Sequence, residues 1–485
     1  MTKTPLCTIV PPYILEALAA SDEPAVAEQA REALQHDERL RSTRRTPTAR
    51  PTGRRAPRRK TGDGAEAHGT GPHRTISDAK GTQTTPGTEV RAEGAPASKD
   101  EAVNEAYDGL GATWELWSAA YARDSLDGKG MPLLATVHYG RNYDNAFWDG
   151  SQMVFGDGDG VIFERFTKSV DVIGHELAHG VTEHTAGLLY QGQSGALNES
   201  ISDVFGVLVK QHLLDQSAEQ ADWLIGADLL APSVKGRALR DMRNPGTAYD
   251  DPRLGKDPQP AHMDHFVDTD DDNGGVHINS GIPNRAFVLA ALAIGGNAWE
   301  TAGSIWYAVV SGDGIKADCD FATFAGLTVA AAGRAHGDGS SEQAAVRSAW
   351  EQVGVLAAGA GDQPADTGGA GGAHRSTPAP APGEGHGTTP GADAQVLLRR
   401  SGGFAGRVRE RRVALGELPE RDAKDWQHLL AAPTLQRIAA STERTHPDAY
   451  IYSVVCDEAG CDVTVQEPHL PEAIHSLFER TLEDG

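Results

Sequence analysis

Hydrophobic residues recur at helical spacing in several separate stretches of the 485-residue chain. The longest early stretch predicts a helix over Glu101–Tyr121. Four more helices are expected, at Gly281–Ala293, Thr301–Val310, Phe321–Gly333 and Ser341–Val353. Strands are expected around Leu133–Tyr139 and Gln152–Phe155, followed by a turn at Gly156–Gly160. A mixed region that ends in helices indicates an α+β fold.

Two stretches without this periodicity divide the chain. Residues 39–98 are rich in Arg, Pro, Gly and Thr, and residues 357–394 are dominated by Gly, Pro, Ala and Thr. Such compositions bury too little apolar surface to fold, so we expect a mostly disordered connector and a flexible linker. The remaining parts are a short segment at residues 1–38, a large globular region at 99–356 and a last unit at 395–485.

The short first segment and the last unit carry patterns of their own. After Pro11 and Pro12, the apolar residues Ile14, Leu15 and Leu18 lie at helical spacing. In the last unit, the pattern predicts a strand at Val408–Leu415, a helix at Asp422–Ala432 and paired strands at Tyr450–Cys456 and Cys461–Gln466. The two cysteines beside the hairpin turn could therefore face one another, and in a reducing compartment they would stay thiols.

Charge is unevenly distributed along the chain. The formal net charge is −24, from 44 basic and 68 acidic residues. Residues 39–60 nevertheless hold ten basic residues and no acidic one, so the remainder is more acidic than the total suggests. This argues against nucleic acid as the main partner. The basic run is interpreted as a solvated connector rather than a binding tail.

No part of the sequence identifies a compartment. No apolar run approaches the ~20 residues needed to span a membrane. The N-terminus has only Lys3 before a short apolar stretch that Pro11 and Pro12 interrupt, although Ala17-Leu18-Ala19 could imitate a cleavage site for a signal peptide. Four cysteines do not make a disulfide framework. We therefore expect a chain that is cytoplasmic as made, with export without a signal peptide left open.

The stretch from Asp171 to His179 carries a metal-binding pattern. His175 and His179 are four residues apart, so on a helix they project from the same face. Two imidazoles placed that way can hold one zinc ion, with Glu176 beside them as a base for a metal-bound water. Glu199, twenty residues past His179, offers a third ligand. This set leaves one position open, as in catalytic zinc sites, whereas structural sites are closed by four protein ligands.

Several further motifs, in matching order along the chain, resemble the thermolysin family of zinc endopeptidases. They are HELAHGVT at 175–182, AGLLY at 186–190, Asn198-Glu199, DNGGVHINSG at 272–281, Val137-His138-Tyr139 and NAFW at 145–148. The resemblance runs from about Asn104 to Val355 and implies the family's two-lobed fold, with the cleft between the lobes. The start of the chain, TIVPPYIL at 8–15, is similar to the short propeptide of the protealysin-like branch, which implies a zymogen. The family is mostly secreted.

The resemblance implies how the metal centre works. Zinc lowers the pKa of a bound water and polarises the peptide carbonyl. Glu176 would take the proton of that water and pass it to the leaving amine. Asp203, on the same helical face as Glu199, would hydrogen-bond the imidazole of His175 and so orient it.

The same resemblance implies the groups that stabilise the transition state. His277 would donate to the oxyanion that forms when the carbonyl becomes tetrahedral. Asp272 would fix the tautomer of His277 and raise its pKa. Tyr190 would be the second oxyanion donor. Every catalytic position is intact, which argues against a dead protease kept as a binding protein.

Substrate contacts follow in the same way. Asn145 and the carbonyl of Ala146 match the groups that hold the substrate backbone, and Arg240 matches the arginine that grips the carbonyl beyond the scissile bond. The residue after that bond would meet an apolar wall formed by Phe163, Phe166, Val172, Ile225, Leu229 and Leu239. Phe166 stands where leucine is common in the family. We therefore expect cleavage on the N-terminal side of bulky apolar residues.

The chain departs from thermolysin at its double calcium site. Asp171 and Asp222 keep two of the positions of that site, whereas Lys210, Leu224 and Ala227 occupy three others. A lysine ammonium stands in for the charge of a bound cation. We predict that this pair of calcium ions is absent.

A thiol near the start of the chain leaves two interpretations open. Cys7 precedes Pro11 by four residues, and a thiolate is a good zinc ligand. Cys7 could therefore plug the open position, or it could be an incidental thiol. The Pro11-Pro12 segment could also block the cleft by itself.

Residues 395–485 resemble emfourin, a small proteinaceous inhibitor associated with protealysin-like enzymes, through the opening SGGFAG at 401–406 and the overall layout. We therefore predict a zymogen with a zinc endopeptidase, its own propeptide and a tethered inhibitor-like domain, acting on peptides or proteins. The alternative makes the last unit a module that binds a surface or partner. Tyr450 and Tyr452, on one strand face, would support it if they were exposed.

Overall fold

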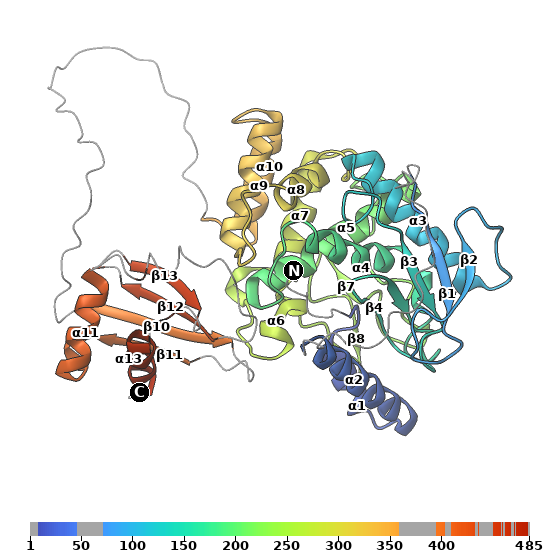
Figure 1. Cartoon of the computed structure of the whole chain (residues 1–485). Coiled ribbons are helices and arrows are strands. Elements are labelled where there is room, and N and C mark those ends of the chain that lie inside the picture. Colours follow the sequence, from blue (N-terminus) through green and yellow to red (C-terminus); the bar gives the residue numbers. More distant parts are fainter. Residues whose placement is uncertain are drawn as a thin grey trace, which may run out of the picture. The chain divides into compact units, whose positions relative to one another are not determined.

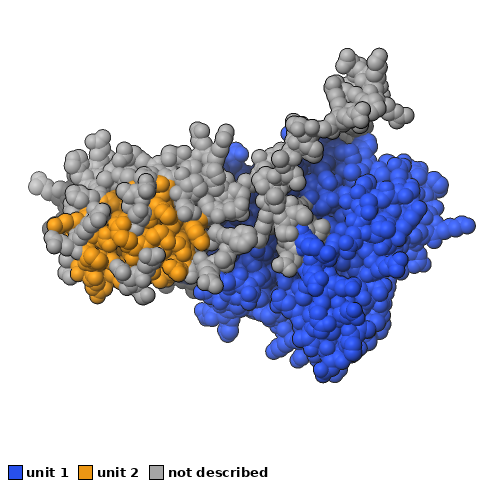
Figure 2. Space-filling view, turned by 60° about the horizontal axis from the view of Figure 1, so that its bottom comes forward, with its two compact units in different colours: residues 1, 3–359 blue, residues 2, 360–485 orange. Residues whose placement is uncertain are grey.

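The computed structural model describes residues 8–45, 71–357, 394–402, 409–431, 450–456, 461–466 and 472–483, with residues 435, 458 and 470. They belong to two compact units, residues 3–359 and 360–485, which Figure 2 colours blue and orange. Each unit has its own buried apolar core. Cys7 and almost all of the expected linker lie outside the described residues.

The first unit begins with two helices. α1 (Pro12–Ala19) follows Pro11, and α2 (Pro24–Arg45) packs against it. The apolar residues Ile14, Leu15 and Leu18 of α1 are buried, as their helical spacing predicts. The expected end of this segment at residue 38 is wrong, because α2 continues to Arg45.

A five-stranded sheet with the order β2-β1-β3-β5-β4 forms the next part (Figure 1). Its strands are β1 (Thr75–Asp78), β2 (Thr88–Ala92), β3 (Leu134–Val137), β4 (Ala146–Trp148) and β5 (Met153–Phe155). The prediction of disorder is therefore wrong for residues 71–98, which hold β1 and β2. Local composition does not reveal β1, because β1 is held by parallel pairing with the distant β3, in which Thr75 lies opposite Leu134.

Three long helices cross the first unit. α3 (Glu101–Tyr121) has the predicted bounds, and Asp100 caps its start by accepting the backbone N–H of Ala102 at 3.0 Å. α4 (Val170–Glu183) and α5 (Gly192–Leu214) follow. They pack closely because Gly206 of α5 faces α4, where a Cβ would lie 2.5 Å from the carbonyl oxygen of Asp171.

The helical lobe agrees with the predicted periodicity. It contains α6 (Asp272–Asn279), α7 (Gly281–Ile294), α8 (Ala302–Val310), α9 (Phe321–His336) and α10 (Ser341–Gln352). In Figure 1, α4 and α5 lie between these helices and the sheet. Shorter elements complete the unit: η1 (Phe166–Lys168), β6 (Leu224–Ile225), β7 (Arg240–Asp241), β8 (Asp250–Asp251), β9 (Gly255–Lys256) and η2 (Met263–His265).

The described residues of the second unit form a four-stranded antiparallel sheet and two helices. The sheet has the order β11-β10-β12-β13, formed by β10 (Gln395–Gly402), β11 (Arg409–Ala414), β12 (Tyr450–Cys456) and β13 (Cys461–Gln466). A turn, η3 (Leu415–Glu417), and the helices α11 (Glu420–Ala431) and α13 (Glu472–Glu483) complete it. The rings of Trp426 and Phe478 stack at 5.2 Å across the helices. β10 and α13 were not predicted.

The predicted hairpin of the second unit is confirmed with its bounds. Cys456 lies directly opposite Cys461 in the ladder, and both are buried thiols.

None of the helices in the described parts of the chain is long and apolar enough to cross a bilayer.

A histidine between two carboxylates joins the loops around the sheet. His138 has a left-handed backbone and follows β3. Its Nδ1 lies 2.9 Å from Asp157 and its Nε2 lies 2.9 Å from Asp100, the cap of α3. The hydrogen bond to Asp157 outweighs partial burial and, with Asp100, raises the pKa of His138 to about 9.

This contact predicts a dependence of stability on pH. The pKa of His138 is higher in the folded protein than its ordinary value of 6.5, so the charged imidazole stabilises the fold fully below about pH 6.5. That contribution is lost as the pH rises through about 9. We expect the Tm of a Glu176→Ala protein, measured by scanning calorimetry, to fall by a few degrees over this range. The control is the double variant Glu176→Ala/His138→Gln. An equal fall of its Tm over the same pH range would contradict the assignment.

Candidate metal centre

Three buried side chains from two helices converge in the first unit. His175 and His179 of α4 and Glu199 of α5 place their ligand atoms within 4.8 Å of one another. The two Nε2 atoms are 3.1 Å apart, and the carboxylate oxygens of Glu199 lie 3.5 and 3.6 Å from them. Among the described residues this is the one group of three or more such side chains that could hold a metal ion.

The first histidine is oriented by a buried ionic contact. The carboxylate of Asp203 lies 2.8 Å from Nδ1 of His175, which turns Nε2 toward Glu199. Arg240 donates to both oxygens of Asp203 at 2.8 Å, and the side chain of Asn284 donates to it as well. Burial alone would raise the pKa of Asp203, but the guanidinium of Arg240 and the imidazole hold it low.

The second histidine is oriented by two neutral groups. Nδ1 of His179 lies 2.8 Å from Oδ1 of Asn198 and 3.0 Å from Oγ of Ser202. Neither side chain was predicted to have a role, although the position of Asn198 directly before Glu199 was a signal. Burial lowers the pKa of His179 to about 4, so its imidazole is neutral, the form that binds metals.

The donor set of this centre fits zinc. Two imidazole nitrogens and one carboxylate are typical of a catalytic zinc with an open position. Glu176 is fully buried beside them, and its Oε2 accepts the backbone N–H of Trp148 at 3.0 Å. Its Oε1 has no hydrogen-bond partner within the described parts of the chain. Burial, with the nearby charge of Glu199, raises the pKa of Glu176 well above its ordinary value.

A tyrosine and a histidine line the other side of the centre. The hydroxyl of Tyr190 donates to Glu199 at 2.6 Å and lies 3.3 Å from Nε2 of His277. Asp272 holds His277 at Nδ1, at 2.6 Å, and at the backbone N–H, at 2.8 Å. This is possible because residues 273–275 have left-handed φ angles and turn the chain sharply. Burial would lower the pKa of His277, but Asp272 and Glu199 raise it.

The predicted substrate-holding groups contact the chain's own first segment. The N–H of Ile9 donates to the carbonyl of Ala146 at 3.1 Å, and the N–H of Val10 donates to Oδ1 of Asn145 at 3.0 Å. The amide of Asn145 donates back to the carbonyl of Val10 at 3.4 Å, and Arg240 donates to the carbonyl of Ile9 at 3.3 Å. Ile9 and Val10 are fully buried.

The helix α2 also contacts the predicted substrate-holding groups. The carboxylate of Asp37 accepts from the hydroxyl of Tyr143 at 2.6 Å and from the amide of Asn145 at 3.0 Å. Next to it, the imidazole of His36 lies 3.0 Å from the hydroxyl of Tyr139. Both residues of α2 are buried. Their contacts were not predicted, because a helical pattern does not say which surface the helix will cover.

The six residues of the expected apolar wall are all buried in one core. The rings of Phe163 and Phe166 lie 5.7 Å apart. The backbone N–H of Leu239 donates to the carbonyl of Ile225 at 2.9 Å, which ties two of the contributing segments together. The predicted blocking residues Pro11 and Pro12 follow Val10 directly and lead into α1.

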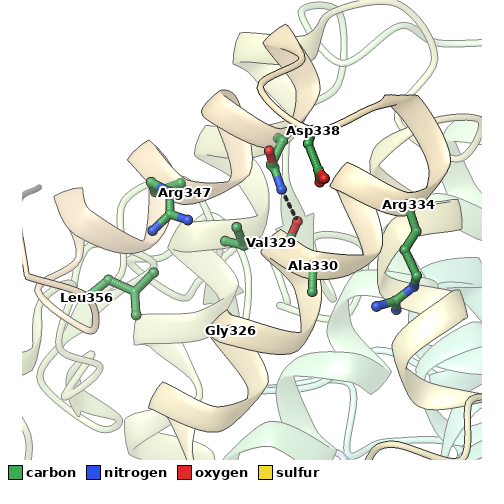
Figure 3. A pocket seen from close by; sticks show the side chains of 8 residues that line it. Gly326, Val329, Ala330, Arg334, Asp338, Arg347 and Leu356 are labelled. Atoms are coloured by element: carbon green, nitrogen blue, oxygen red, sulfur yellow. Dashed lines mark hydrogen bonds between the residues drawn. The ribbon is translucent and has the colours of Figure 1, made fainter. Parts of the chain in front are cut away.

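A separate cavity of about 410 Å³ lies between α9 and α10 (Figure 3). Arg347 and Arg334 line it and lie on opposite sides of Val329 in this view. The side chain of Gln343 donates to the carbonyl of Val329 at 3.2 Å beside it. None of the predicted site residues lines this cavity, so it is not part of the metal centre.

Three family models match the chain. The catalytic domain of thermolysin metallopeptidase matches residues 59–183, and the alpha-helical domain of thermolysin metallopeptidase matches residues 186–355. The emfourin model matches residues 398–482. The three matches follow one another along the chain and cover both described units.

Individual proteins agree with these matches. An extracellular metalloprotease of Pectobacterium carotovorum subsp. carotovorum is 49% identical over 355 residues, which cover 73% of this chain and 98% of that protein. The protease PrtS of Photorhabdus sp. (strain Az29) is 55% identical over 285 residues, 58% of this chain and 76% of that protein. The solved precursor of protealysin from Serratia proteamaculans is 50% identical with a TM-score of 0.64, covering 72% of this chain and all of that one. The chain therefore belongs to the thermolysin family of zinc metalloendopeptidases and carries an emfourin domain in its C-terminal part.

Proposed function

We propose that this metalloendopeptidase is made as a zymogen whose own first segment occupies the substrate cleft. The observation that carries the proposal is the backbone pairing of Ile9 and Val10 with Asn145, Ala146 and Arg240. A segment held by backbone hydrogen bonds along a strand edge binds as an extended peptide substrate would. Asp37 of α2 contacts Tyr143 and Asn145, so α2 covers the same part of the cleft.

The residues around the ligands divide the chemical work. Zinc held by His175, His179 and Glu199 would supply Lewis acidity toward the scissile carbonyl and toward water. Glu176 takes a proton from water through Oε1, the oxygen without a hydrogen-bond partner in the described parts of the chain, and passes the proton to the leaving amine. The hydrogen bond from Trp148 to its other oxygen keeps the carboxylate in this orientation.

Two donors stabilise the negative charge that develops on the carbonyl oxygen. His277 is held by Asp272 at Nδ1, so its Nε2 side is presented to the cleft. The hydroxyl of Tyr190 lies beside that nitrogen. His277 is already oriented by Asp272, so it needs little reorganisation during the reaction, whereas the Tyr190 hydroxyl has to turn its proton from Glu199 to the oxyanion.

The apolar wall sets the preference for the residue after the scissile bond. We propose that Phe163, Phe166, Val172, Ile225, Leu229 and Leu239 receive a bulky apolar side chain such as that of Leu, Phe or Ile. Burying such a side chain contributes about 1.5–3 kcal/mol. Ile9, whose carbonyl contacts Arg240, is a residue of this kind and is fully buried.

Maturation removes the first segment through a cut in residues 46–70. A cut before Thr75 leaves β1 whole, whereas a cut inside β1 or β2 would break the edge of the five-stranded sheet. A cut after Arg45 leaves α2 whole. Breaking the chain here separates the blocking helices from the catalytic region without disturbing either.

Replacing the proposed base tests the catalytic assignment. We expect Glu176→Ala to remain at full length while wild type loses its first 45–70 residues, because Glu176 is needed to move the proton. Zinc content, measured by atomic emission, should be one per chain in both, since Glu176 is not a ligand. Intact mass spectrometry over time gives the comparison, with Glu183→Ala of the same helix as the matched control. Cutting of Glu176→Ala at the wild-type rate would refute the assignment.

We further propose that a lysine replaces the double calcium site of thermolysin. Nζ of Lys210 lies 2.8 Å from Asp222 and 3.4 Å from the buried Asp171. Burial lowers the pKa of Lys210, but these two carboxylates outweigh it and raise the pKa. The ammonium thus supplies the positive charge that this place requires.

Removing the lysine should expose this substitution. In Lys210→Ala the buried Asp171 loses its cation, which costs about 3–5 kcal/mol for a buried pair. We expect the double variant Glu176→Ala/Lys210→Ala to have a lower Tm than the parent Glu176→Ala, and millimolar calcium to restore part of the difference. Calcium should leave the Tm of the parent unchanged. Stabilisation of the parent by calcium would show that the site still binds the ion.

The emfourin domain is proposed to be a tethered inhibitor of the same enzyme. The alternative of a binding module relied on exposed Tyr450 and Tyr452. Tyr452 is fully buried against Phe478, and Tyr450 is half-buried with the guanidinium of Arg400 at 4.3 Å from its ring centre. A tethered domain acts at an effective concentration of about millimolar, so even a modest affinity suffices.

The excised domain decides between the two interpretations. Residues 394–485 carry their own core, so they can be added separately to the processed enzyme. We expect inhibition of peptide cleavage at a stoichiometric amount. The control is Trp426→Ala, which removes a fully buried ring from the core and should abolish inhibition. Full activity in the presence of the folded domain would favour the binding module.

A further inference from the structure

The segment that blocks the cleft is placed as a substrate and not only as a plug. We propose that the peptide bond between Thr8 and Ile9 lies in the reacting position, so that the precursor cuts this bond of its own chain. The inference rests on the proposed endopeptidase function and names the first substrate of that function.

The register of the segment on β4 gives its direction. β4 is an edge strand of the sheet. The backbone N–H of Ile9 donates to the carbonyl of Ala146, the first residue of β4, and the N–H of Val10 donates to the side chain of Asn145, the residue before β4. The residue numbers rise from Ile9 to Val10 while those of their partners fall from Ala146 to Asn145. The segment therefore runs antiparallel to β4. The chain that precedes Ile9 therefore advances along β4 toward Trp148. The chain that follows Val10 leads away into α1.

This direction brings the start of the segment to the proposed base. The backbone N–H of Trp148 holds one oxygen of Glu176 at 3.0 Å, at the end of β4 toward which Thr8 extends. Thr8 itself is buried. The peptide bond on the N-terminal side of Ile9 is therefore the one that approaches Glu176 and the three ligands.

The contacts of the Ile9 and Val10 carbonyls place the segment relative to the scissile bond. The carbonyl of Ile9 accepts from Arg240, which is bound to Asp203 and so lies one contact from His175. The carbonyl of Val10 accepts from the amide of Asn145 and from the hydroxyl of Thr8. Arg240 is proposed to bind the carbonyl of the residue after the scissile bond, so its contact with Ile9 makes the carbonyl of Thr8 the one that is attacked. Ile9 is then the bulky apolar residue after the scissile bond.

The reaction is a simple hydrolysis with water as the only co-reactant. The bond between the carbonyl carbon of Thr8 and the nitrogen of Ile9 breaks, the oxygen of water joins that carbon to give a carboxylate, and both protons of the water pass to the nitrogen, which leaves as an ammonium group. The new amine of Ile9 can keep its hydrogen bond to Ala146. Asp37 and the buried face of α1 still hold the segment, so this cut alone does not open the cleft.

The test is the N-terminus of the purified full-length precursor over time. Intact mass and N-terminal sequencing should show a species that begins at Ile9 and appears before the cut in residues 46–70, at a rate independent of protein concentration. The species should be absent in Glu176→Ala. It should persist in Ile9→Leu and be lost in Ile9→Asp, because a carboxylate does not fit an apolar wall. A precursor that is cut in residues 46–70 with residues 1–8 still attached overturns the inference.

A second measurement does not depend on catalysis. In metal-free Glu176→Ala precursor, hydrogen–deuterium exchange of the amides of Ile9 and Val10 should be slowed at least tenfold relative to a synthetic peptide of residues 5–14. Free exchange would mean that the segment does not lie on β4 and would also overturn the inference.

A fluorogenic peptide added to the processed enzyme separates this inference from the proposed function. If the enzyme cleaves the peptide but the precursor never yields the Ile9 terminus, only the register inference fails. If it cleaves neither, the proposed function fails as well.

Discussion

The close contact between α4 and α5 is the constraint on which the rest of the centre depends. The two histidines project from one helix and Glu199 and Asp203 project from the other, so the ligands converge only if the backbones approach. Gly174 and Gly206 make this approach possible, since a Cβ at either position would meet the opposite helix within about 3 Å. Zinc affinity thus rests on two residues that contribute no ligand.

A buried chain of charges connects the metal centre to the substrate cleft. His175 is held by Asp203, and Asp203 is held in turn by Arg240, all three almost fully buried. Such an arrangement is favourable only when each charge is matched, because desolvation of an unpaired ion costs several kcal/mol. Arg240 also binds the carbonyl of Ile9, so one guanidinium fixes both a metal ligand and a peptide backbone.

The edge of the sheet explains how one surface can serve substrate and propeptide alike. β4 has one neighbour, β5, so its other side offers unpaired backbone groups to an extended chain. The first segment contacts that edge with Ile9 and Val10, and Asp37 of α2 contacts Asn145 beside it. In the proposed zymogen, such pairing would need no special side chain of the blocking segment, so the same groups would be able to accept different substrates.

The sequence by itself determined whatever depends on near neighbours along the chain. The spacing of His175 and His179, the long helix α3, the helices of the second lobe and the hairpin of the last unit all follow from local periodicity. Only the tertiary structure decided contacts between distant segments. β1 and β2 appeared in a stretch whose composition indicated disorder, because β1 is stabilised by pairing with β3. Asp37 contacts the edge of the sheet because α2 lies over Tyr143 and Asn145. Tyr452 is part of the core, because packing against a distant helix decides which face of a strand is buried.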